Sequence, residues 1–545
     1  MARLLVIFVV LAGVVSSPSI AKNVRVTTPL GVLEGTAVAV EDSTVSEFRG
    51  IPFALPPIQD RRWKPAEVWS HPWQGVRQAK AFAPPCMQPQ KFSSRDATQD
   101  MSEDCLYLNI WTPANLSAEK LASLPVMVWI HGGSLLSGTS RINGASLASK
   151  GVVVVSIAYR LGVFGYYAHP ELTAESPHRA SGNYGTTDQI AALKWVQANI
   201  AAFGGDPGNV LIFGLSAGAY STIHLLASPL AKGLFHRAIM HSGYLKFLQP
   251  LKEPSHGRPS AEVSGLRLAR AAGARSLAQL RAMPAQKVLD VVNAYTDVYD
   301  AIPEVVLDGW VFRAQLFDTF SRGEHNIVPI LIGSTSNEQY RLLTGREDWK
   351  TVVPKNAAEY RSMIGRLYGD HADEYLALYP AGDYNKIDDW RWLASMRDSF
   401  YTFPAHKIAR DSARISPDVY LYYFDQRSPW QGDAGAYHGA DARHLFKDWE
   451  GISPTDADLR LADIIQNYWA SFAKSGNPNT LGQPFWPPYS DGDRAFTAFR
   501  DGAAVPGRNL LPGMLEFWEA RFRERWEEGK HPWVVTGIGV YPPAK

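Results

Sequence analysis

The segment Gly214–Gly218 reads GLSAG, so that one serine, Ser216, stands two residues from a glycine on either side. It follows an apolar run at 210–213 and opens a helical pattern at 216–227, which is the strand–turn–helix context of a nucleophile elbow. The sharp turn requires glycine because a side chain there would collide with neighbouring backbone. The turn would expose the Ser216 hydroxyl above a sheet, beside a helix N-terminus that favours negative charge. The alternative is a serine that caps a helix after a glycine turn.

A second segment of small residues, HGGS at 131–134, directly follows an apolar run at 126–130. In ester cleavage the tetrahedral intermediate carries an oxyanion, and one backbone N–H aimed at it contributes about 3–4 kcal/mol to lowering the barrier. Gly132 and Gly133 can approach a substrate because they have no Cβ. Their N–H groups, together with that of Ala217, are the predicted oxyanion hole. The alternative is a plain glycine turn.

Short apolar runs with the length of buried strands alternate with helical patterns along the chain. The strands are expected at 126–130, 152–157, 210–213, 235–240 and 327–332. An amphipathic helix is expected at 188–202, ended by Gly204-Gly205-Asp206-Pro207. This alternation predicts an α/β fold, with a mostly parallel sheet covered by helices on both faces.

The remaining helical patterns suggest additions to one domain rather than separate domains. Two insertions are expected at 261–294 and 356–414, and two amphipathic helices at 459–474 and 514–528. No repeat, low-complexity tract or long linker separates them. Although 545 residues permit several domains, we expect a single domain over 22–545 with helical insertions.

The composition excludes several classes of protein. Lys+Arg is 54 and Asp+Glu is 53, so the formal net charge is +1, which argues against a nucleic-acid partner or an acidic tail. The 17 Trp, 23 Tyr and 23 Phe indicate a large packed core. Only two cysteines are present, which excludes a zinc site built from several thiolates. Neither the GLSAG nor the HGGS segment has the Lys-Ser/Thr ending of a phosphate loop. No metal or organic cofactor is expected.

Residues 1–21 have the pattern of an export signal. Arg3 gives a positive start, 4–15 is apolar, and Ser19-Ile20-Ala21 offers small residues for cleavage near Ala21. A membrane anchor is the weaker alternative, because a membrane span needs about 20 apolar residues. A secreted or periplasmic protein without stable membrane insertion is therefore expected. In such a compartment Cys86 and Cys105 are expected to form a disulfide, with two buried free thiols as the alternative.

Taken together, these segments resemble the type-B carboxylesterases, which include cholinesterases and bacterial para-nitrobenzyl esterases. Further motifs that carry the resemblance are FRGIPFA at 48–54, SEDCLYLNI at 102–110, NYG at 183–185 and FGGDP at 203–207. The resemblance implies an α/β-hydrolase fold, a catalytic triad in the chain order Ser, Glu, His, and a small-molecule ester as substrate. The cysteine pair also matches the first disulfide of that family.

The same resemblance assigns the other two triad members. Glu338 lies in a glycine-led segment, 333–338, just past the predicted strand at 327–332, and His438 lies in AYHGAD at 436–441. The chemistry requires a base that takes the Ser216 proton and a carboxylate that holds the imidazole tautomer. Residue patterns alone do not select these two among 14 histidines and 53 acidic residues. His224, His241 and His444 also lie near motifs and are interpreted as packing or surface residues.

The sequence departs from the cholinesterase pattern at three positions, where Leu215, Ala158 and Ser134 replace the usual Glu, Asn and Gly. Without a carboxylate beside the nucleophile, a cationic substrate is less favoured and an anionic acyl group is repelled less. Together with Arg141 and Arg160, this suggests esters of polycarboxylic acids, such as the tricarballylate esters cleaved by fumonisin esterases. The alternative is a harmless apolar substitution.

The expected function is that of a secreted carboxylic-ester hydrolase that works through a covalent acyl-serine. Two other functions remain open on the same fold: a non-catalytic cholinesterase-like binding module, since a fold does not fix a function, and an interfacial lipase.

Overall fold

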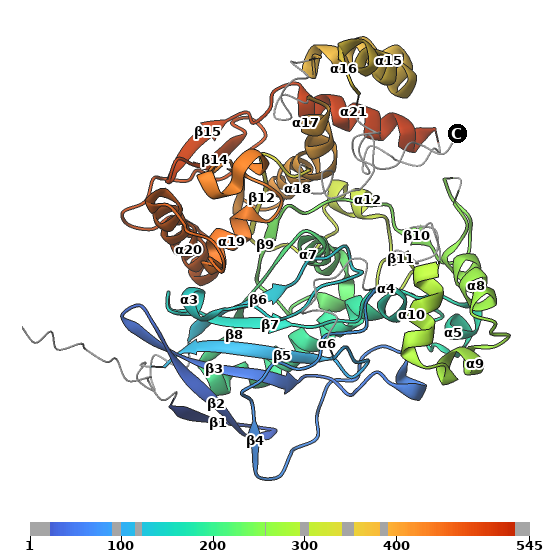
Figure 1. Cartoon of the computed structure of the whole chain (residues 1–545), viewed down its shortest axis with the longest axis vertical. Helices are drawn as coiled ribbons and strands as arrows, with labels where there is room; N and C mark the ends of the chain where they lie inside the picture. The colour runs from blue at the N-terminus through green and yellow to red at the C-terminus, as the bar shows by residue number, and fades with distance from the viewer. Residues whose placement is uncertain are drawn as a thin grey trace, which may run out of the picture.

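The computed structural model describes residues 22–89, 100–114, 123–256, 258–294, 305–339, 354–381 and 391–528. The predicted export signal at 1–21 lies outside these residues. A large mixed sheet extends through the middle of the molecule, with helices on both of its faces (Figure 1). The prediction of an α/β fold is therefore confirmed.

The sheet has thirteen strands, and its order is β1-β2-β3-β5-β7-β6-β8-β9-β12-β13-β14-β15, with β4 paired to β2. Every neighbouring pair from β7 to β14 is parallel, and antiparallel strands extend both edges. The parallel strands are β7 (Val153–Ile157), β6 (Leu124–Ile130), β8 (Gly205–Leu215), β9 (Arg237–His241), β12 (Ile330–Thr335), β13 (Val419–Phe424) and β14 (Ala495–Arg500). The edges are formed by β1 (Asn23–Thr28), β2 (Gly31–Val40), β3 (Ser43–Pro52), β4 (Val76–Gln78), β5 (Tyr107–Pro113) and β15 (Ala503–Arg508).

All five predicted strands are present, as β6, β7, β8, β9 and β12, with bounds shifted by a few residues. They are the strands buried on both faces. Along β6, for example, Val126 and Val128 point into one hydrophobic cluster and Met127 and Trp129 into another on the opposite face. A strand covered in this way is apolar at every position, which makes it visible in a sequence.

Helices α6 (Tyr184–Asn199) and α7 (Ala217–Ala227) cover one face of the sheet, while α3 (Ala145–Ala148), α19 (Ala440–Phe446) and α20 (Asp456–Ser475) cover the other. The expected amphipathic helix at 188–202 corresponds to α6, but amphipathic is the wrong description. Most of its side chains are buried, because the sheet lies on one side and α4 (Gly162–Gly165) and α7 lie on others. After a short 3-10 turn the segment ends at Gly204, whose φ of 84° is left-handed.

The bounds of α20 follow from its caps. The Thr455 hydroxyl accepts the Asp458 N–H at 3.2 Å, and the Asp458 carboxylate accepts the Thr455 N–H at 2.8 Å, which forms a capping box. Gly476, with φ 80°, ends the helix. The predicted helix at 459–474 is therefore present and extends further at both ends.

Both predicted helical insertions are present, and the last helix of the second one packs on β12 and β13 (Figure 1). The first contains α8 (Ala261–Ala271), α9 (Leu277–Ala282) and α10 (Ala285–Ala294), and the second α15 (Ala357–Tyr368), α16 (Ala372–Leu378), α17 (Arg391–Arg397) and α18 (Phe403–Ala413). Smaller elements are α5 (Pro170–Glu175), α12 (Leu316–Ser321) and a two-stranded sheet of β10 (Gln249–Pro250) and β11 (Val306–Leu307). The last helix, α21 (Met514–Glu527), matches the prediction for 514–528. In the described ranges, no helix combines the length and the apolar character that crossing a membrane requires.

Candidate active site

Ser216 stands in the tight turn between β8 and α7, with φ 58° and ψ −121°. A non-glycine residue with this φ is strained, and such strain is found mainly at functional sites. The flanking glycines are required: a Cβ on Gly214 would lie 2.4 Å from the carbonyl carbon of Gly218, and one on Gly218 would lie 2.0 Å from the carbonyl oxygen of Ile130. Although Ser216 occupies the N-cap position, its side chain makes no capping hydrogen bond. The helix-cap interpretation is therefore wrong.

The loop after β6 lies directly against this turn. A Cβ on Gly132 would lie 2.7 Å from the carbonyl oxygen of Leu215 and 3.2 Å from Cβ of Ser216, so only glycine permits the approach. Within the described part of the chain, the N–H groups of Gly132, Gly133 and Ala217 have no hydrogen-bond acceptor. Unpaired N–H groups beside a nucleophile are the feature expected of an oxyanion hole.

His131 fixes the start of the same loop. Its ring stacks on Tyr159 with centroids 4.4 Å apart, and the Tyr159 hydroxyl donates to the His131 carbonyl oxygen at 2.8 Å. The Nδ1 atom lies 2.9 Å from the carbonyl oxygen of Gly132. Burial lowers the pKa of His131 to about 4, despite the hydrogen bond to Gly132, so the ring is neutral at pH 7. A neutral ring with Nδ1 protonated can donate to that oxygen.

Glu338 and His438, 100 residues apart, meet at one hydrogen bond: Nδ1 of His438 lies 2.5 Å from Oε2 of Glu338. The two segments are joined by the Asn337 N–H, which donates to the Ala436 carbonyl oxygen at 3.0 Å. The Glu338 side chain is fully buried, whereas that of His438 retains 15% exposure. A buried carboxylate on Nδ1 holds the proton there and leaves Nε2 to act as a base.

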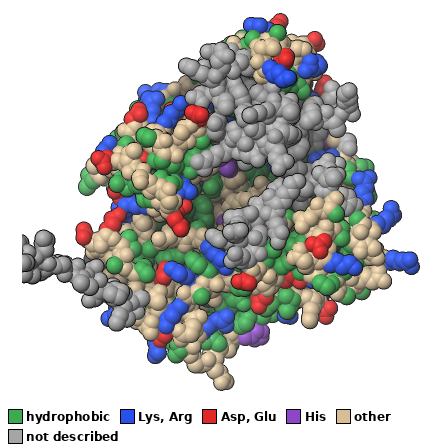
Figure 2. Space-filling view, in the orientation of Figure 1, with side chains coloured by type: hydrophobic (Ala, Val, Ile, Leu, Met, Phe, Trp, Pro, Cys, Tyr) green, Lys and Arg blue, Asp and Glu red, His purple; other side chains and the backbone are tan. Residues whose placement is uncertain are grey.

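The segments that carry Ser216 and His438 are in contact. Cδ2 of Leu215 lies 3.0 Å from where a Cβ on Gly439 would be. Among the described residues, no hydrogen bond joins the Ser216 hydroxyl to the His438 ring, and such bonds are often long before a substrate binds. Figure 2 shows a hollow in the face of the molecule that is turned toward the viewer, with hydrophobic side chains and a histidine visible inside it.

Ser242 is a site residue that the sequence interpretation missed. Its hydroxyl donates to Oε1 of Glu338 at 2.5 Å, and the Thr335 N–H donates to the same oxygen at 2.6 Å. Ser242 directly follows β9, just as Ser216 follows β8. Because the carboxyl ends of parallel strands meet at one edge of a sheet, this position was a signal that could have identified it.

His241, next to Ser242, supports the backbone of the Ser216 turn. Its carbonyl oxygen accepts the Ser216 N–H at 2.9 Å. Nε1 of Trp469 donates to Nε2 of His241 at 3.0 Å, so the ring hydrogen is on Nδ1, which lies 2.9 Å from the Asp441 carboxylate. Tyr422 donates to that same carboxylate at 2.6 Å. His241 is thus a packing residue, as interpreted, but within a hydrogen-bonded cluster.

The other two histidines near motifs are also buried. Nε2 of His444 lies 3.1 Å from Oδ1 of Asp458, and its Nδ1 lies 2.7 Å from the carbonyl oxygen of Ala440. These two contacts join α19 to the start of α20. His224 lies on α7, with its ring centroid 3.9 Å from that of Tyr220, and has no hydrogen-bond partner on either ring nitrogen in the described structure. Among the described residues, neither histidine forms a hydrogen bond with Glu338 or Ser216.

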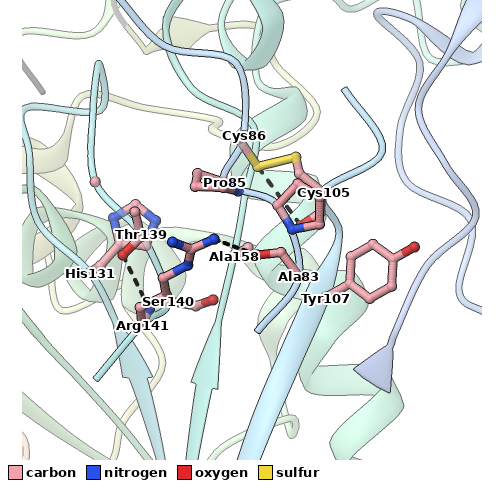
Figure 3. Close-up of a pocket in the computed structure, with 12 residues that line it drawn as sticks. Ala83, Pro85, Cys86, Cys105, Tyr107, His131, Thr139, Ser140, Arg141 and Ala158 are labelled. Atoms are coloured by element: carbon pink, nitrogen blue, oxygen red, sulfur yellow. Dashed lines mark hydrogen bonds between the residues drawn. A yellow bond between two sulfur atoms is a disulfide. The ribbon is translucent and has the colours of Figure 1, made fainter. Parts of the chain in front are cut away.

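Cys86 and Cys105 form a disulfide, with Cα atoms 5.0 Å apart, so the predicted pairing is confirmed. Figure 3 shows the disulfide beside a small pocket, with His131, Thr139 and Arg141 at its other wall. The disulfide therefore lies behind the loop of Gly132 and Gly133. In the ranges that the structure describes, no three His, Cys, Asp or Glu side chains converge to hold a metal ion.

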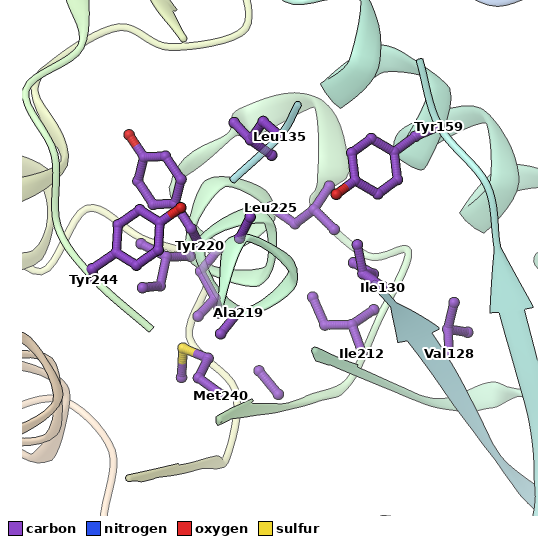
Figure 4. Close-up of a cluster of buried hydrophobic side chains, with 14 of the residues drawn as sticks. Val128, Ile130, Leu135, Tyr159, Ile212, Ala219, Tyr220, Leu225, Met240 and Tyr244 are labelled. Atoms are coloured by element: carbon purple, nitrogen blue, oxygen red, sulfur yellow. The ribbon is translucent and has the colours of Figure 1, made fainter. Parts of the chain in front are cut away.

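Aromatic side chains lead away from His438. The ring centroid of His438 lies 4.9 Å from that of Tyr401, and the ring centroid of Tyr401 lies 4.7 Å from that of Phe400. The ring centroid of Tyr244 lies 4.9 Å from that of Phe400. On its other side the Tyr244 ring stacks on Tyr220 of α7, with centroids 4.7 Å apart. Figure 4 shows Tyr220 and Tyr244 beside α7, above the buried strand residues. We call these four residues, Tyr220, Tyr244, Phe400 and Tyr401, the aromatic wall.

The parallel sheet, the strained serine after β8 and the paired Glu and His define an ester hydrolase of the α/β-hydrolase class. The chain belongs to the carboxylesterase family, whose family model matches residues 22–518. It is 35% identical to fumonisin B1 esterase from Sphingopyxis macrogoltabida over 84% of this chain and 83% of that protein. It is 33% identical to human cocaine esterase over 93% of each chain. The solved structure of a PNB esterase superposes with a TM-score of 0.73 at 31% identity, and covers 89% of this chain and 97% of the other.

Proposed function

We propose that this carboxylic ester hydrolase uses Ser216 as nucleophile, His438 as general base and acid, and Glu338 as the carboxylate that orients His438. The observation that supports the assignment is the 2.5 Å contact between Glu338 and His438 in segments packed against the strained Ser216 turn. The reaction needs no metal or organic cofactor.

In the first half of the reaction, Oγ of Ser216 bonds to the ester carbonyl carbon while Nε2 of His438 takes the hydroxyl proton. The carbonyl oxygen becomes an oxyanion, held by the N–H groups of Gly132, Gly133 and Ala217. The intermediate then collapses: the bond to the alkoxide breaks, His438 returns the proton to it, and the alcohol leaves. An acyl-serine remains.

In the second half, His438 removes a proton from water, whose oxygen attacks the acyl carbon. The second tetrahedral intermediate uses the same three N–H groups. Its collapse breaks the bond to Oγ of Ser216, which regains a proton from His438, and releases the carboxylic acid.

The assignment of the nucleophile is tested with Ser216→Ala in residues 22–545. We expect hydrolysis of a p-nitrophenyl ester to be lost with the fold intact, and a fluorophosphonate to label the wild-type peptide that contains Ser216. Ser221→Ala is a control, since Ser221 is a buried serine of α7 whose hydroxyl accepts from Gln189 at 2.9 Å. A folded Ser216→Ala enzyme that keeps its rate would reject the proposal.

We also propose that residues 1–21 are removed on export and that the enzyme acts in the periplasm or outside the cell. The Arg3-led apolar segment supports this, and so does the Cys86–Cys105 disulfide, which favours an oxidising compartment. N-terminal sequencing of the native protein should begin near Lys22. A mature protein that retains its first residues would reject the proposal.

As a second candidate, we propose that the substrate is an ester of a polycarboxylic acid. The similarity to fumonisin B1 esterase and the apolar Leu215 beside the nucleophile favour this class. The arginines named from the sequence offer less support. Arg160 is buried and donates to both Asp188 oxygens, at 2.8 and 2.7 Å, so its charge is neutralised. Arg141 is exposed at the pocket behind the loop, beside Thr139.

A cation near the aromatic wall is Lys246, whose Nζ lies 5.7 Å from the ring centroid of Tyr244. We propose that Lys246 attracts the free carboxylates of the acyl group. In Lys246→Met, kcat/KM should fall for an ester that carries free carboxylates and stay unchanged for its neutral methyl-ester analogue. Lys252→Met, on an exposed lysine nearby in the chain, is the control. Equal or faster wild-type turnover of the neutral ester would reject this candidate.

A further inference from the structure

The far limb of the oxyanion loop is held by one buried side chain, Gln88. The Gly138 N–H donates to Oε1 of Gln88 at 2.9 Å, and Nε2 of Gln88 donates to the Gly138 carbonyl oxygen at 3.0 Å. The amide thus pairs with Gly138 in both directions, as a neighbouring strand would. Gln88 has no exposed surface, so water does not compete for these bonds.

Gly138 in turn lies against the start of the loop. Its φ is 119°, and a Cβ there would lie 2.4 Å from Nδ1 of His131 and 2.5 Å from the carbonyl oxygen of Gly132. The Gly132 carbonyl belongs to the same planar peptide unit as the Gly133 N–H, and in a trans peptide the two point in opposite directions. Whatever fixes the Gly132 oxygen therefore also fixes the direction of the Gly133 N–H.

Gln88 is itself tied to the disulfide. Its Nε2 also donates to the carbonyl oxygen of Cys86 at 3.1 Å, and Cys86 is bonded to Cys105, two residues before β5. Figure 3 shows the disulfide on one wall of the small pocket and His131 and Thr139, next to Gly138, on the other. The chain of contacts thus runs from β5 through the disulfide and Gln88 to Gly138.

We propose that Gln88 is a positioning residue for the oxyanion hole and that the Cys86–Cys105 disulfide influences catalysis through it. The inference rests on the proposed function, in which the Gly133 N–H binds the oxyanion. Gln88 does not touch the substrate; it holds Gly138, and through it the peptide between Gly132 and Gly133.

A residue that acts only on the oxyanion hole affects the transition state more than the bound substrate. Removal of a whole oxyanion donor lowers kcat about 100- to 1000-fold, so misalignment of one should lower it by about 10- to 100-fold. In Gln88→Met we therefore expect that loss in kcat, with KM within about twofold of wild type. Affinity for a trifluoromethyl ketone, which forms an oxyanion adduct with the nucleophile, should fall by the same factor. Affinity for the corresponding unreactive amide should not change.

Two further variants separate positioning from folding. Gln88→Glu keeps an acceptor for the Gly138 N–H but loses both donated bonds, so its kcat should lie between those of Gln88→Met and wild type. Gln286→Met is the control, because Gln286 is exposed on α10 and its hydrogen bond is to Asp290. Circular dichroism and melting temperature verify that each variant is folded.

The link to the disulfide is tested by a double-mutant cycle. Cys86→Ala with Cys105→Ala should lower kcat, and the addition of Gln88→Met should lower it no further, since both act on the same loop. If the combined variant lost kcat by the product of the two separate factors, the link between the disulfide and Gln88 would be overturned. A wild-type kcat in Gln88→Met and Gln88→Glu, with Ser216→Ala inactive, would overturn this inference and leave the proposed function intact. Full activity in Ser216→Ala would instead reject the proposed function.

Discussion

Ser242 and His438 hold opposite oxygens of one buried carboxylate: the Ser242 hydroxyl donates to Oε1 of Glu338, and Nδ1 of His438 meets Oε2, each at 2.5 Å. The Ser242 N–H also donates to the Gly333 carbonyl oxygen at 2.8 Å, which joins the end of β9 to β12. The position of Glu338 is therefore determined from two sides, by the strand ends and by the His438 imidazole.

We predict that Ser242→Ala lowers kcat by about 10- to 100-fold with little change in KM. A hydrogen bond to a charged group contributes about 1.5–3 kcal/mol, and its loss lets the carboxylate turn away from His438. Steady-state kinetics on a p-nitrophenyl ester measures both constants. Ser228→Ala is the control, because this buried serine donates to the Val311 carbonyl oxygen, away from the triad. Equal kcat in the two variants would contradict the prediction.

A second prediction concerns the hydrogen-bonded cluster of His241, Asp441, Tyr422 and Trp469 beneath the Ser216 turn. Burial raises the pKa of the Asp441 carboxyl, but the hydrogen bonds that the carboxylate accepts from His241, Tyr422 and the Ala442 N–H outweigh burial, so the pKa is lowered. A lowered folded pKa adds stability above the unfolded value, 3.8, and this stability is lost as the pH falls toward the folded pKa. Asp441→Asn should therefore cost about 2–3 kcal/mol at pH 7.

The control for Asp441→Asn is the pH dependence itself. Urea unfolding at pH 7, 5 and 3.5 should show the difference between wild type and variant narrowing only in the last step, below the usual pKa of the carboxyl. A difference that stays constant across the three pH values would show that packing alone, and no charge, is lost.

The core of the fold and the candidate nucleophile, Ser216, could be predicted because their signals are local. β6 and β8 are buried on both faces, so they read as unbroken apolar runs. The turn at Ser216 requires glycines within two residues, which any reader of the sequence can find. The sequence interpretation missed the outer strands β1 to β3, since they are only partly buried and polar residues or glycines interrupt their apolar residues.

The rest of the site depends on contacts between distant segments. Nothing local selects Glu338 among 53 acidic residues; its place in the candidate site follows from its hydrogen bonds with Ser242 and His438, which are 96 and 100 positions away. Only the family resemblance identified the Glu–His pair. Arg160 illustrates the converse: its position near a motif suggested a role with anionic substrates, but Asp188, 28 residues away, neutralises it. Burial and pairing of a charge are properties of the folded state.

The third prediction concerns the buried ion pair between Arg160 and Asp188. Arg160→Met should destabilise the enzyme by about 3–5 kcal/mol, because it leaves the fully buried Asp188 carboxylate without its cation. The double variant Arg160→Met/Asp188→Leu should recover most of that loss, since no buried charge remains. Chemical denaturation measures both. The ratio of kcat/KM for a carboxylate-bearing ester over its neutral analogue should stay at the wild-type value in the double variant. A lower ratio would restore Arg160 as a substrate-binding residue.

The fourth prediction uses His224, which is fully buried on α7 between Tyr220 and Phe312. Burial lowers its pKa from 6.5 to about 3. Below pH 6.5 the unfolded chain binds a proton that the folded protein does not, so stability falls as the pH falls from about 6.5 toward 3. At pH 5 this amounts to about 2 kcal/mol. His224→Phe should therefore gain about that much more stability at pH 5 than at pH 8, as urea unfolding would show. Phe312→Leu alters the same packing without a titratable group, so its effect should be equal at both pH values; an equally pH-independent effect of His224→Phe would contradict the assignment.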